Sequence, residues 1–145
     1  MKMSRIVAVL RSKRKGMAKR KIATGYLRRD YGLVGDAHAG SGRQVSLLAL
    51  ESIQRMQKRG FKVKPGDFAE NLTTEGIDLL SLTKGKRIFI GKRIILEITQ
   101  IGKECPAPCA IFRKLGECIM PKEGVFARVI KGGRVRADDY LEVER

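Results

Sequence analysis

Apolar residues in this chain fall mostly into short runs that glycine, proline or charged residues interrupt. The segment RIVAVL, residues 5–10, is rich in valine and isoleucine and predicts a β-strand. The segment KIATGYL, residues 21–27, predicts a weaker strand, because Gly25 lies inside it. Strands of this length are typical of a sheet assembled from many short segments.

A β-hairpin is predicted further along the chain. Its strands are residues 86–90 and 93–101, with Gly91 and Lys92 at the turn. The segment GVFARVIKGGRVRADDYLEVE, residues 124–144, predicts further strands around a Gly-Gly pair. Strand signals therefore outnumber helix signals.

Helix signals are few and short. Ser46 resembles an N-cap, Gly60 resembles a C-cap, and the residues between them repeat with helical period. The apolar face of that predicted helix consists of Leu47, Leu50, Ile53 and Met56. Residues 77–82, IDLLSL, predict one further helical turn. The pattern predicts a mainly β domain with a few short α-helices, folded as a closed or half-closed barrel.

Length and composition are those of one ordinary domain. The chain has 145 residues and a hydrophobic content of 43%, but no tryptophan, so its core must be mostly aliphatic. No apolar run approaches the roughly 18 residues of a membrane span. The N-terminal apolar patch precedes its basic residues, whereas a signal peptide has the reverse order. We therefore expect a cytoplasmic protein without a membrane partner.

A large positive charge narrows the choice of partners. The 31 Lys and Arg residues against 15 Asp and Glu give a net charge of +16, and seven basic residues lie between Arg11 and Lys21. Such a surface attracts anions, either nucleic acid or a phosphorylated small molecule, or is simply well solvated. The basic run has no interleaved aromatic residues, which disfavours nucleic acid as a partner.

A glycine-rich loop carries the only histidine. The segment GLVGDAHAGSGR, residues 32–43, contains four glycines, and His38 follows Asp36 within it. Asp36 could orient the imidazole ring, and Arg43 could present its guanidinium to an anion, so the loop is a candidate anion or cofactor pocket. The alternative is a loop histidine with only local contacts and a surface arginine.

All three cysteines lie in one segment, at positions 105, 109 and 118. In a reducing compartment such a group indicates thiol chemistry or metal ligation rather than a disulfide framework. Cys109 follows Pro-Ala-Pro and begins a predicted short helix, residues 109–116, whose N-terminus would stabilise a thiolate. Cys105 could be a resolving thiol or second ligand, and Cys118 could simply be packed among apolar neighbours.

Structural zinc is another interpretation of the same residues. The three cysteines with His38 would supply a Cys₃His set, but the C-x₃-C-x₈-C spacing is not that of a familiar zinc finger.

Five segments in order resemble the MOSC domain, the C-terminal domain of molybdenum cofactor sulfurases, from about Ile6 to Leu141. They are GLVGDAHAG, RQVSLLALESI, GDFAENLTTEGIDL, the cysteine segment and GVFARVIKGG. The resemblance is to the short stand-alone bacterial form. It implies a single MOSC domain over residues 1–145, with a β-barrel-like fold of the pyruvate-kinase-barrel kind.

The resemblance also implies a role. The protein would carry sulfur as a persulfide, or hold the molybdenum cofactor, molybdopterin, through a cysteine thiolate. Expected partners are a sulfur donor such as a cysteine desulfurase, and molybdopterin-biosynthesis proteins or molybdoenzymes. The pyridoxal phosphate domain of larger sulfurases could not fit in this chain, so no pyridoxal phosphate site is expected. A cofactor-dependent reductase component for N-hydroxylated compounds is one alternative, and a non-enzymatic module binding nucleic acid or an acidic protein is another.

The resemblance implies site residues at the positions of this chain that match the motifs of the family. Cys109 matches the family's proline-preceded cysteine and is the expected persulfide carrier or molybdenum ligand, with Cys105 beside it as a second catalytic candidate. The expected cofactor-binding residues are His38, Arg43, Glu70, Asn71, Thr73 and Arg128. A polar turn at residues 70–73 and an outward-facing arginine are the plainer alternatives. The family more often has glycine where this chain has Ala69.

Overall fold

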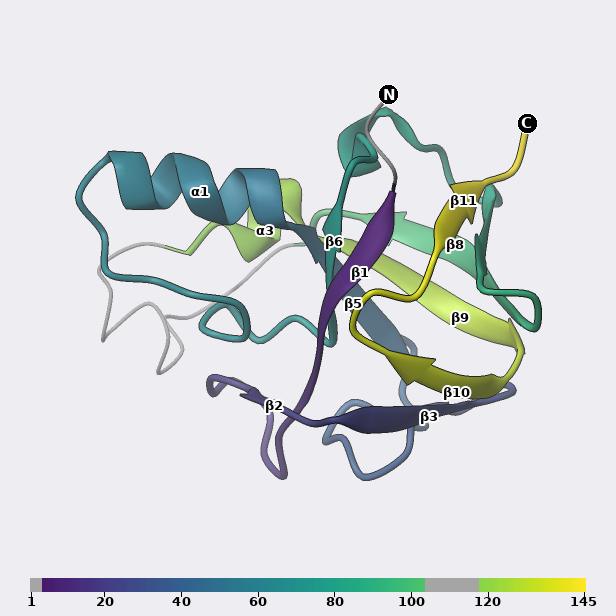
Figure 1. The fold of residues 1–145 in the computed structure, drawn as a ribbon. Helices are drawn as coiled ribbons and strands as arrows, with labels where there is room; N and C mark the ends of the chain where they lie inside the picture. The colour runs from purple at the N-terminus through teal and green to yellow at the C-terminus, as the bar shows by residue number, and fades with distance from the viewer. Residues whose placement is uncertain (1–3, 104–117) are drawn as a thin grey trace.

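Strands dominate the fold, and eight of them form one sheet that curls into a half-barrel (Figure 1). The computed structural model describes residues 4–103 and 118–145. The order in the large sheet is β11-β7-β8-β9-β5-β6-β1-β2, and a smaller sheet has the order β10-β3-β4. The strands are β1 (Arg5–Arg11), β2 (Arg20–Lys21), β3 (Thr24–Arg28), β4 (Gly32–Leu33), β5 (Val45–Ala49), β6 (Leu72–Glu75), β7 (Arg87–Ile90), β8 (Ile94–Ile101), β9 (Val125–Lys131), β10 (Gly133–Arg136) and β11 (Leu141–Val143). The helices are α1 (Leu50–Lys58) and α3 (Met120–Glu123), with a 3₁₀ turn, η1 (Leu79–Ser81). The predicted mainly β, barrel-like class is therefore confirmed.

Several local predictions are confirmed as well. The strand at residues 5–10 is β1, and the hairpin at residues 86–101 is β7 and β8, in which Ile90 pairs with Ile94. Gly91 takes a positive φ of 59° in the turn. The segment KIATGYL contains the end of β2 and most of β3.

The predicted start of the first helix, with Ser46 as its N-cap, is wrong. Val45–Ala49 form strand β5, and α1 begins only at Leu50. β5 pairs antiparallel with β9 on one edge and parallel with β6 on the other. A parallel pair needs a crossover connection, and α1 supplies it. Both faces of β5 are buried, so its run of apolar residues could be mistaken for the beginning of the helix.

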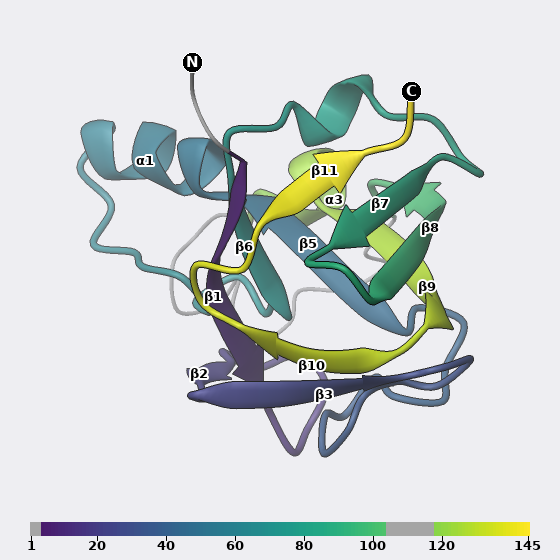
Figure 2. The ribbon, with the colours of Figure 1, turned by 45° about the vertical axis from the view of Figure 1, so that its right-hand side comes forward.

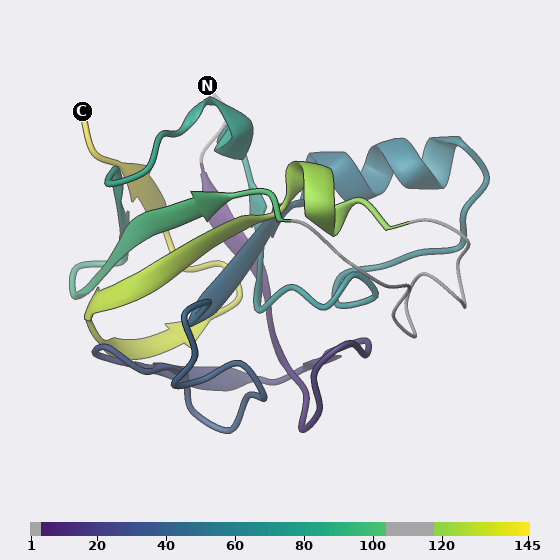
Figure 3. The same ribbon diagram turned by 180° about the vertical axis from the view of Figure 1, so that it is seen from behind.

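The core has two parts. The larger one is aliphatic and fills the inside of the half-barrel. The second lies between the sheet and the helices and consists of Leu48, Ile53, Met56, Val63, Phe68, Ile119, Met120 and Phe126. Figure 3 shows α1 and α3 side by side over this part of the sheet. The Ser52 hydroxyl donates to the Glu123 carboxylate at 2.9 Å, and Arg55 pairs with the same carboxylate, which joins the two helices.

The small sheet lies across one end of the half-barrel. In Figure 2, β3 and β10 run together below the larger sheet. Their antiparallel register places Val135 opposite Gly25, and both of these residues are buried. No helix within residues 4–103 and 118–145 is both long and apolar enough to cross a membrane.

Candidate functional site

The glycine-rich loop after β4 is organised by the carboxylate of Asp36. One oxygen, Oδ1, accepts the Ser12 backbone N–H at 3.0 Å and the Lys19 ammonium at 2.8 Å. The other oxygen, Oδ2, accepts the backbone N–H of His38 at 3.0 Å. Asp36 therefore fixes the backbone on which His38 stands and ties this loop to the basic segment after β1.

Lys19 and Asp36 form a buried ion pair. Both side chains are 0% exposed, and the ammonium also donates to the Ser12 hydroxyl at 3.0 Å. Burial by itself raises the pKa of Asp36, but the hydrogen bonds from Lys19, His38 and Ser12 and the charge of Lys19 outweigh it. The net effect is a lowered pKa, so the carboxylate stays ionised at neutral pH.

His38 and Arg43 line the same pocket. The Ser41 hydroxyl donates to the His38 carbonyl at 2.6 Å and accepts the Arg43 backbone N–H at 3.1 Å. The open pocket has a volume of about 380 Å³, and its lining residues are Lys15, His38, Ser41, Gly42, Arg43 and Gln100. The loop therefore brings together the two residues that its sequence singled out; their binding roles stay predictions.

The aromatic ring of Phe126 holds two cations at the edge of this pocket. The guanidinium of Arg43 lies 5.5 Å from the ring centroid, and the ammonium of Lys103 lies 5.9 Å from it. Arg43 also donates from Nε to the Gln100 side-chain oxygen at 3.4 Å. Within residues 4–103 and 118–145, no carboxylate pairs with Arg43, Lys103 or Lys15. The pocket thus concentrates positive charge without an internal counterion.

His38 is neutral in this setting. Burial lowers its pKa most, the charges of Lys19, Lys15 and Lys103 lower it further, and Asp36 opposes them, which leaves a pKa of about 4. At neutral pH the imidazole can therefore donate one hydrogen bond and accept another. An anion in the pocket would offset the lysine charges and favour protonation of the ring.

Glu70, Asn71 and Thr73 lie at and just before the start of β6, and all three are buried. The Asn71 side-chain oxygen accepts from the Ser46 N–H and hydroxyl at 3.0 and 3.1 Å, and its amide N–H donates to the Leu10 carbonyl at 3.2 Å. Asn71 thus joins β1, β5 and β6. Its side chain is not among those that line the pocket of His38.

The Glu70 carboxyl is buried with one oxygen unpartnered. The Thr73 hydroxyl donates to Oε2 at 2.7 Å, whereas Oε1 has no hydrogen-bond partner among the described residues. Burial raises the pKa of Glu70 to about 7, against the hydrogen bonds from Thr73 and the Gly66 backbone. The preceding residue, Ala69, has a φ of 67°, the left-handed conformation that favours glycine. A glycine, which the resemblance leads us to expect at this position, would adopt that conformation without strain.

Arg128 does not point into the barrel, contrary to the inward orientation suggested by its strand. Its side chain is 45% exposed, donates from Nε to Glu97 at 3.0 Å and lies 3.9 Å from Asp30. Phe126, two residues earlier, is covered by the second core cluster, and that cover ends before Arg128 is reached. The arginine thus stands on the outer surface of the sheet; its predicted cofactor role has no contact here that supports it.

Of the three cysteines, only Cys118 lies within the described residues. Cys105, Cys109 and the helix predicted at residues 109–116 lie outside them. Cys118 is half-buried against the second core cluster, as the packing alternative expected. Residues 4–103 and 118–145 contain no group of three or more His, Cys, Asp or Glu side chains that could hold a metal ion.

Sequence reasoning did not assign Lys15 and Gln100 to the pocket, or Lys19, Lys103 and Phe126 to its surroundings. Lys15 and Lys19 belong to the basic run whose attraction for anions was recognised, but nothing local indicated which members face the loop. Gln100 and Lys103 lie at and after the end of β8, and Phe126 lies on β9, which pairs with β8. Only the pairing of these distant strands brings them beside Arg43.

Solved structures with the same architecture identify the fold. The chain superposes on the YuaD protein from Bacillus subtilis with a TM-score of 0.77 at 20% identity, covering 97% of this chain and 96% of that one. For YiiM from Geobacillus stearothermophilus the TM-score is 0.75 at 19% identity, with 98% and 75% covered. For YiiM from Escherichia coli it is 0.68 at 20% identity, with 97% and 70% covered.

Family membership follows from the sequence itself. The sequence model of the MOSC domain matches residues 34–142, about three quarters of the chain. The chain therefore belongs to the MOSC domain family, which is associated with molybdenum cofactor sulfurase-like proteins. No curated protein matches the sequence.

Proposed function

We propose that this MOSC protein handles the molybdenum cofactor or its sulfur, with the pocket of His38 and Arg43 as its anion-binding site. Cys109 supplies the thiolate, either as a persulfide carrier or as a ligand to the metal. The pocket binds the phosphate of the pterin, and the cysteine segment supplies the soft sulfur.

One observation supports the proposal most strongly: among the described residues, the positive charge of the pocket has no internal counterion. Arg43 and Lys103 share the ring of Phe126, and Lys15 lines the same pocket. Like charges held together repel one another, and a bound anion relieves that repulsion. The guanidinium of Arg43 also offers paired N–H donors that match two phosphate oxygens.

The residues present fit a phosphorylated ligand. Arg43, Lys103 and Lys15 would hold its phosphate, and the neutral imidazole of His38 would donate a further hydrogen bond. When bound, the cofactor supplies a molybdenum centre that accepts sulfur ligands. Lys103 precedes Cys105 by two residues in the sequence, so the pocket and the cysteine segment are directly connected along the chain.

The sulfur-carrier form of the proposal is a thiol–persulfide exchange. The Cys109 thiolate attacks the outer sulfur of a persulfide on the donor protein, and a new S–S bond forms at Cys109. The S–S bond of the donor breaks, and its electron pair leaves with the donor cysteine as a thiolate. No net oxidation occurs, and the net positive charge of the protein favours the thiolate form of the attacking cysteine.

The pocket is tested with protein purified anaerobically from a host that makes the cofactor. In the wild type we expect retained pterin and molybdenum, or one added sulfur atom on Cys109 in the mass spectrum. Arg43→Ala with Lys103→Ala removes two charge-assisted contacts and should reduce pterin retention about tenfold or more. The matched control is Lys58→Ala with Lys84→Ala, which removes two exposed lysines that do not line the pocket.

The cysteine is tested separately. Cys109→Ser should lose the added sulfur or the molybdenum, while the thermal unfolding midpoint stays close to that of the wild type. Retention of pterin without molybdenum in Cys109→Ser would assign the cysteine to the metal. Equal retention of pterin, metal and sulfur in both variants and in the lysine control would refute the proposal.

A further inference from the structure

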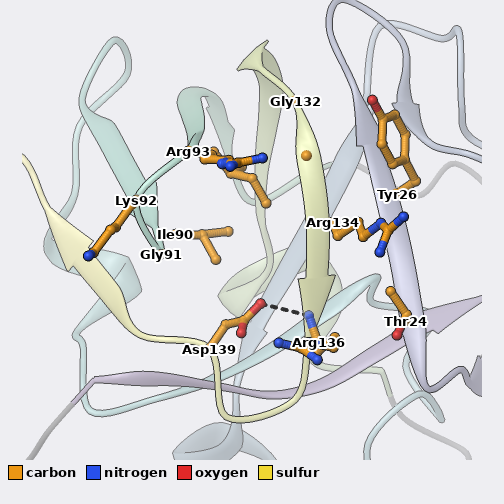
Figure 4. Close-up of a pocket in the computed structure, with 12 residues that line it drawn as sticks. Thr24, Tyr26, Ile90, Gly91, Lys92, Arg93, Gly132, Arg134, Arg136 and Asp139 are labelled. Atoms are coloured by element: carbon orange, nitrogen blue, oxygen red, sulfur yellow. Dashed lines mark hydrogen bonds between the residues drawn. The ribbon is translucent and has the colours of Figure 1, made fainter.

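A second basic pocket lies at the end of the half-barrel that the paired strands β3 and β10 cover (Figure 4). It shares no lining residue with the pocket of His38 and is larger, with a volume of about 620 Å³. One wall is the outer face of β3 and β10, and the other is the turn between β7 and β8.

The first wall is set by the register of a two-stranded ribbon. Arg134 on β10 lies opposite Tyr26 on β3, and Arg136 lies opposite Thr24. These four side chains are exposed, whereas Gly25 and its neighbours on the other face are buried. Because side chains alternate along a strand, the ribbon presents two arginines and a tyrosine to the pocket.

The second wall adds more positive charge above an apolar floor. Lys92 and Arg93 lie in the exposed β7–β8 turn, and Ile90 and Ile94 at its base are only 2% exposed. The single carboxylate that lines the pocket, Asp139, accepts the backbone N–H of Arg136 at 2.8 Å (Figure 4).

The four cations of this pocket have no ion-pair partner in the part of the chain that the structure describes. Within residues 4–103 and 118–145, no carboxylate lies within ion-pair distance of the side chains of Lys92, Arg93, Arg134 and Arg136. Elsewhere on the surface, Arg5, Arg87 and Arg128 do pair with carboxylates. The pocket therefore carries positive charge that no described carboxylate neutralises, and such a surface attracts anions.

The edge of β10 that faces the pocket is open only in part. Asp139 takes the backbone of Arg136, because its carboxylate accepts the Arg136 N–H at 2.8 Å and its own N–H donates to the Arg136 carbonyl at 3.2 Å. β10 is the terminal strand of its sheet, and it pairs only with β3. In Figure 4, β3 lies on one side of β10, and the β7–β8 turn lies on the other. The remaining edge, at Arg134, offers one main-chain donor and one acceptor to a further extended segment.

We propose that this groove binds an extended acidic segment of a partner protein, which adds beside β10. Its backbone pairs with β10 at Arg134, and its carboxylates lie near Arg93, Arg134 and Arg136. Alternate apolar side chains of the segment pack over Ile90 and Ile94, because side chains on a strand alternate between two faces. A single-stranded nucleic acid fits less well, since Tyr26 is the one aromatic ring among the described lining residues.

The experiment measures binding of a labelled hexapeptide that alternates glutamate with valine, by fluorescence anisotropy. Arg134→Glu with Arg136→Glu should weaken binding about tenfold or more, because two attractive charges become repulsive. Lys58→Glu with Lys84→Glu makes the same change in net charge at exposed sites outside the groove and should have a much smaller effect. The milder variant Arg93→Gln should weaken binding in the same direction.

Two further readouts decide the kind of ligand. Hydrogen exchange at the Arg134 amide should slow on peptide binding, and a peptide with glutamine in place of glutamate should bind far less. Equal affinity in the groove variant and the lysine control would overturn the proposal. An oligothymidine that binds more tightly than the peptide, depends on the same arginines and does not protect β10 would also overturn it. That result would make the groove a nucleic-acid site. Arg43→Ala with Lys103→Ala should leave peptide binding unchanged, so this inference and the cofactor proposal fail independently.

Discussion

Lys19→Met is expected to lower the free energy of unfolding by about 3–5 kcal/mol, because it leaves the carboxylate of Asp36 buried without its counterion. Both side chains of the pair are 0% exposed, so water cannot replace the lost ammonium. Protonation of Asp36 would remove the buried charge. It would also weaken the hydrogen bonds that the carboxylate accepts from the Ser12 and His38 backbone N–H groups. Urea unfolding at pH 7 measures the loss.

A second variant separates the ion pair from simple packing. Asp36→Asn combined with Lys19→Met removes both charges and keeps one side-chain oxygen for a backbone N–H, so much of the lost stability should return. The control is Lys64→Met, which breaks an ion pair whose lysine is 77% exposed. That change should cost less than about 1 kcal/mol. Losses of equal size for Lys19→Met and Lys64→Met would contradict the assigned role of burial.

Strand positions could be predicted from the sequence wherever apolar runs were short and clearly bounded. β1 and the β7–β8 hairpin are such cases, since each run ends at charged or turn residues. β5 could not be separated from α1, because a strand buried on both faces has no alternation and the next residue already begins the helix.

The sequence predicted which residues of one loop share a pocket, but not which residues distant in the sequence come to lie beside them. His38 and Arg43 belong to one loop, so their presence in one pocket followed from short-range sequence. Phe126 comes beside Arg43, and Lys103 beside Phe126, through the pairing of β8 with β9, which no local pattern encodes. Whether the side chain of Arg128 is covered or exposed depends on how far the helices extend over the sheet. This too is a property of the whole fold.

The groove beside β10 illustrates the same limit. Its arginines were visible in the sequence only as part of a generally basic chain. Their significance comes from the register of β3 with β10 and from the lack of an ion pair to their side chains among the described residues. Net charge predicted that anions would be attracted; only the arrangement of strands distinguishes two separate pockets.

Glu70→Gln and His38→Gln are expected to give opposite dependences of stability on pH. The pKa of Glu70 is raised from 4.5 to about 7 in the folded protein, so the folded state binds more protons than the unfolded state between these values. Its contribution to stability is present below pH 4.5 and is lost as the pH rises through 7. The pKa of His38 is lowered from 6.5 to about 4, so its contribution is present above pH 6.5 and is lost as the pH falls through 4.

Over pH 4.5–6.5 the two groups therefore oppose each other, and the wild type should show a nearly flat stability profile in that range. His38→Gln leaves the Glu70 effect, so its free energy of unfolding should fall by up to about 3 kcal/mol as the pH rises from 4.5 to 7. Glu70→Gln leaves the His38 effect, so its free energy of unfolding should rise by up to about 3 kcal/mol between pH 4 and pH 6.5. Urea unfolding at half-unit pH intervals measures both slopes. Slopes of the same sign in the two variants would show that at least one of these groups does not titrate in the environment described for it.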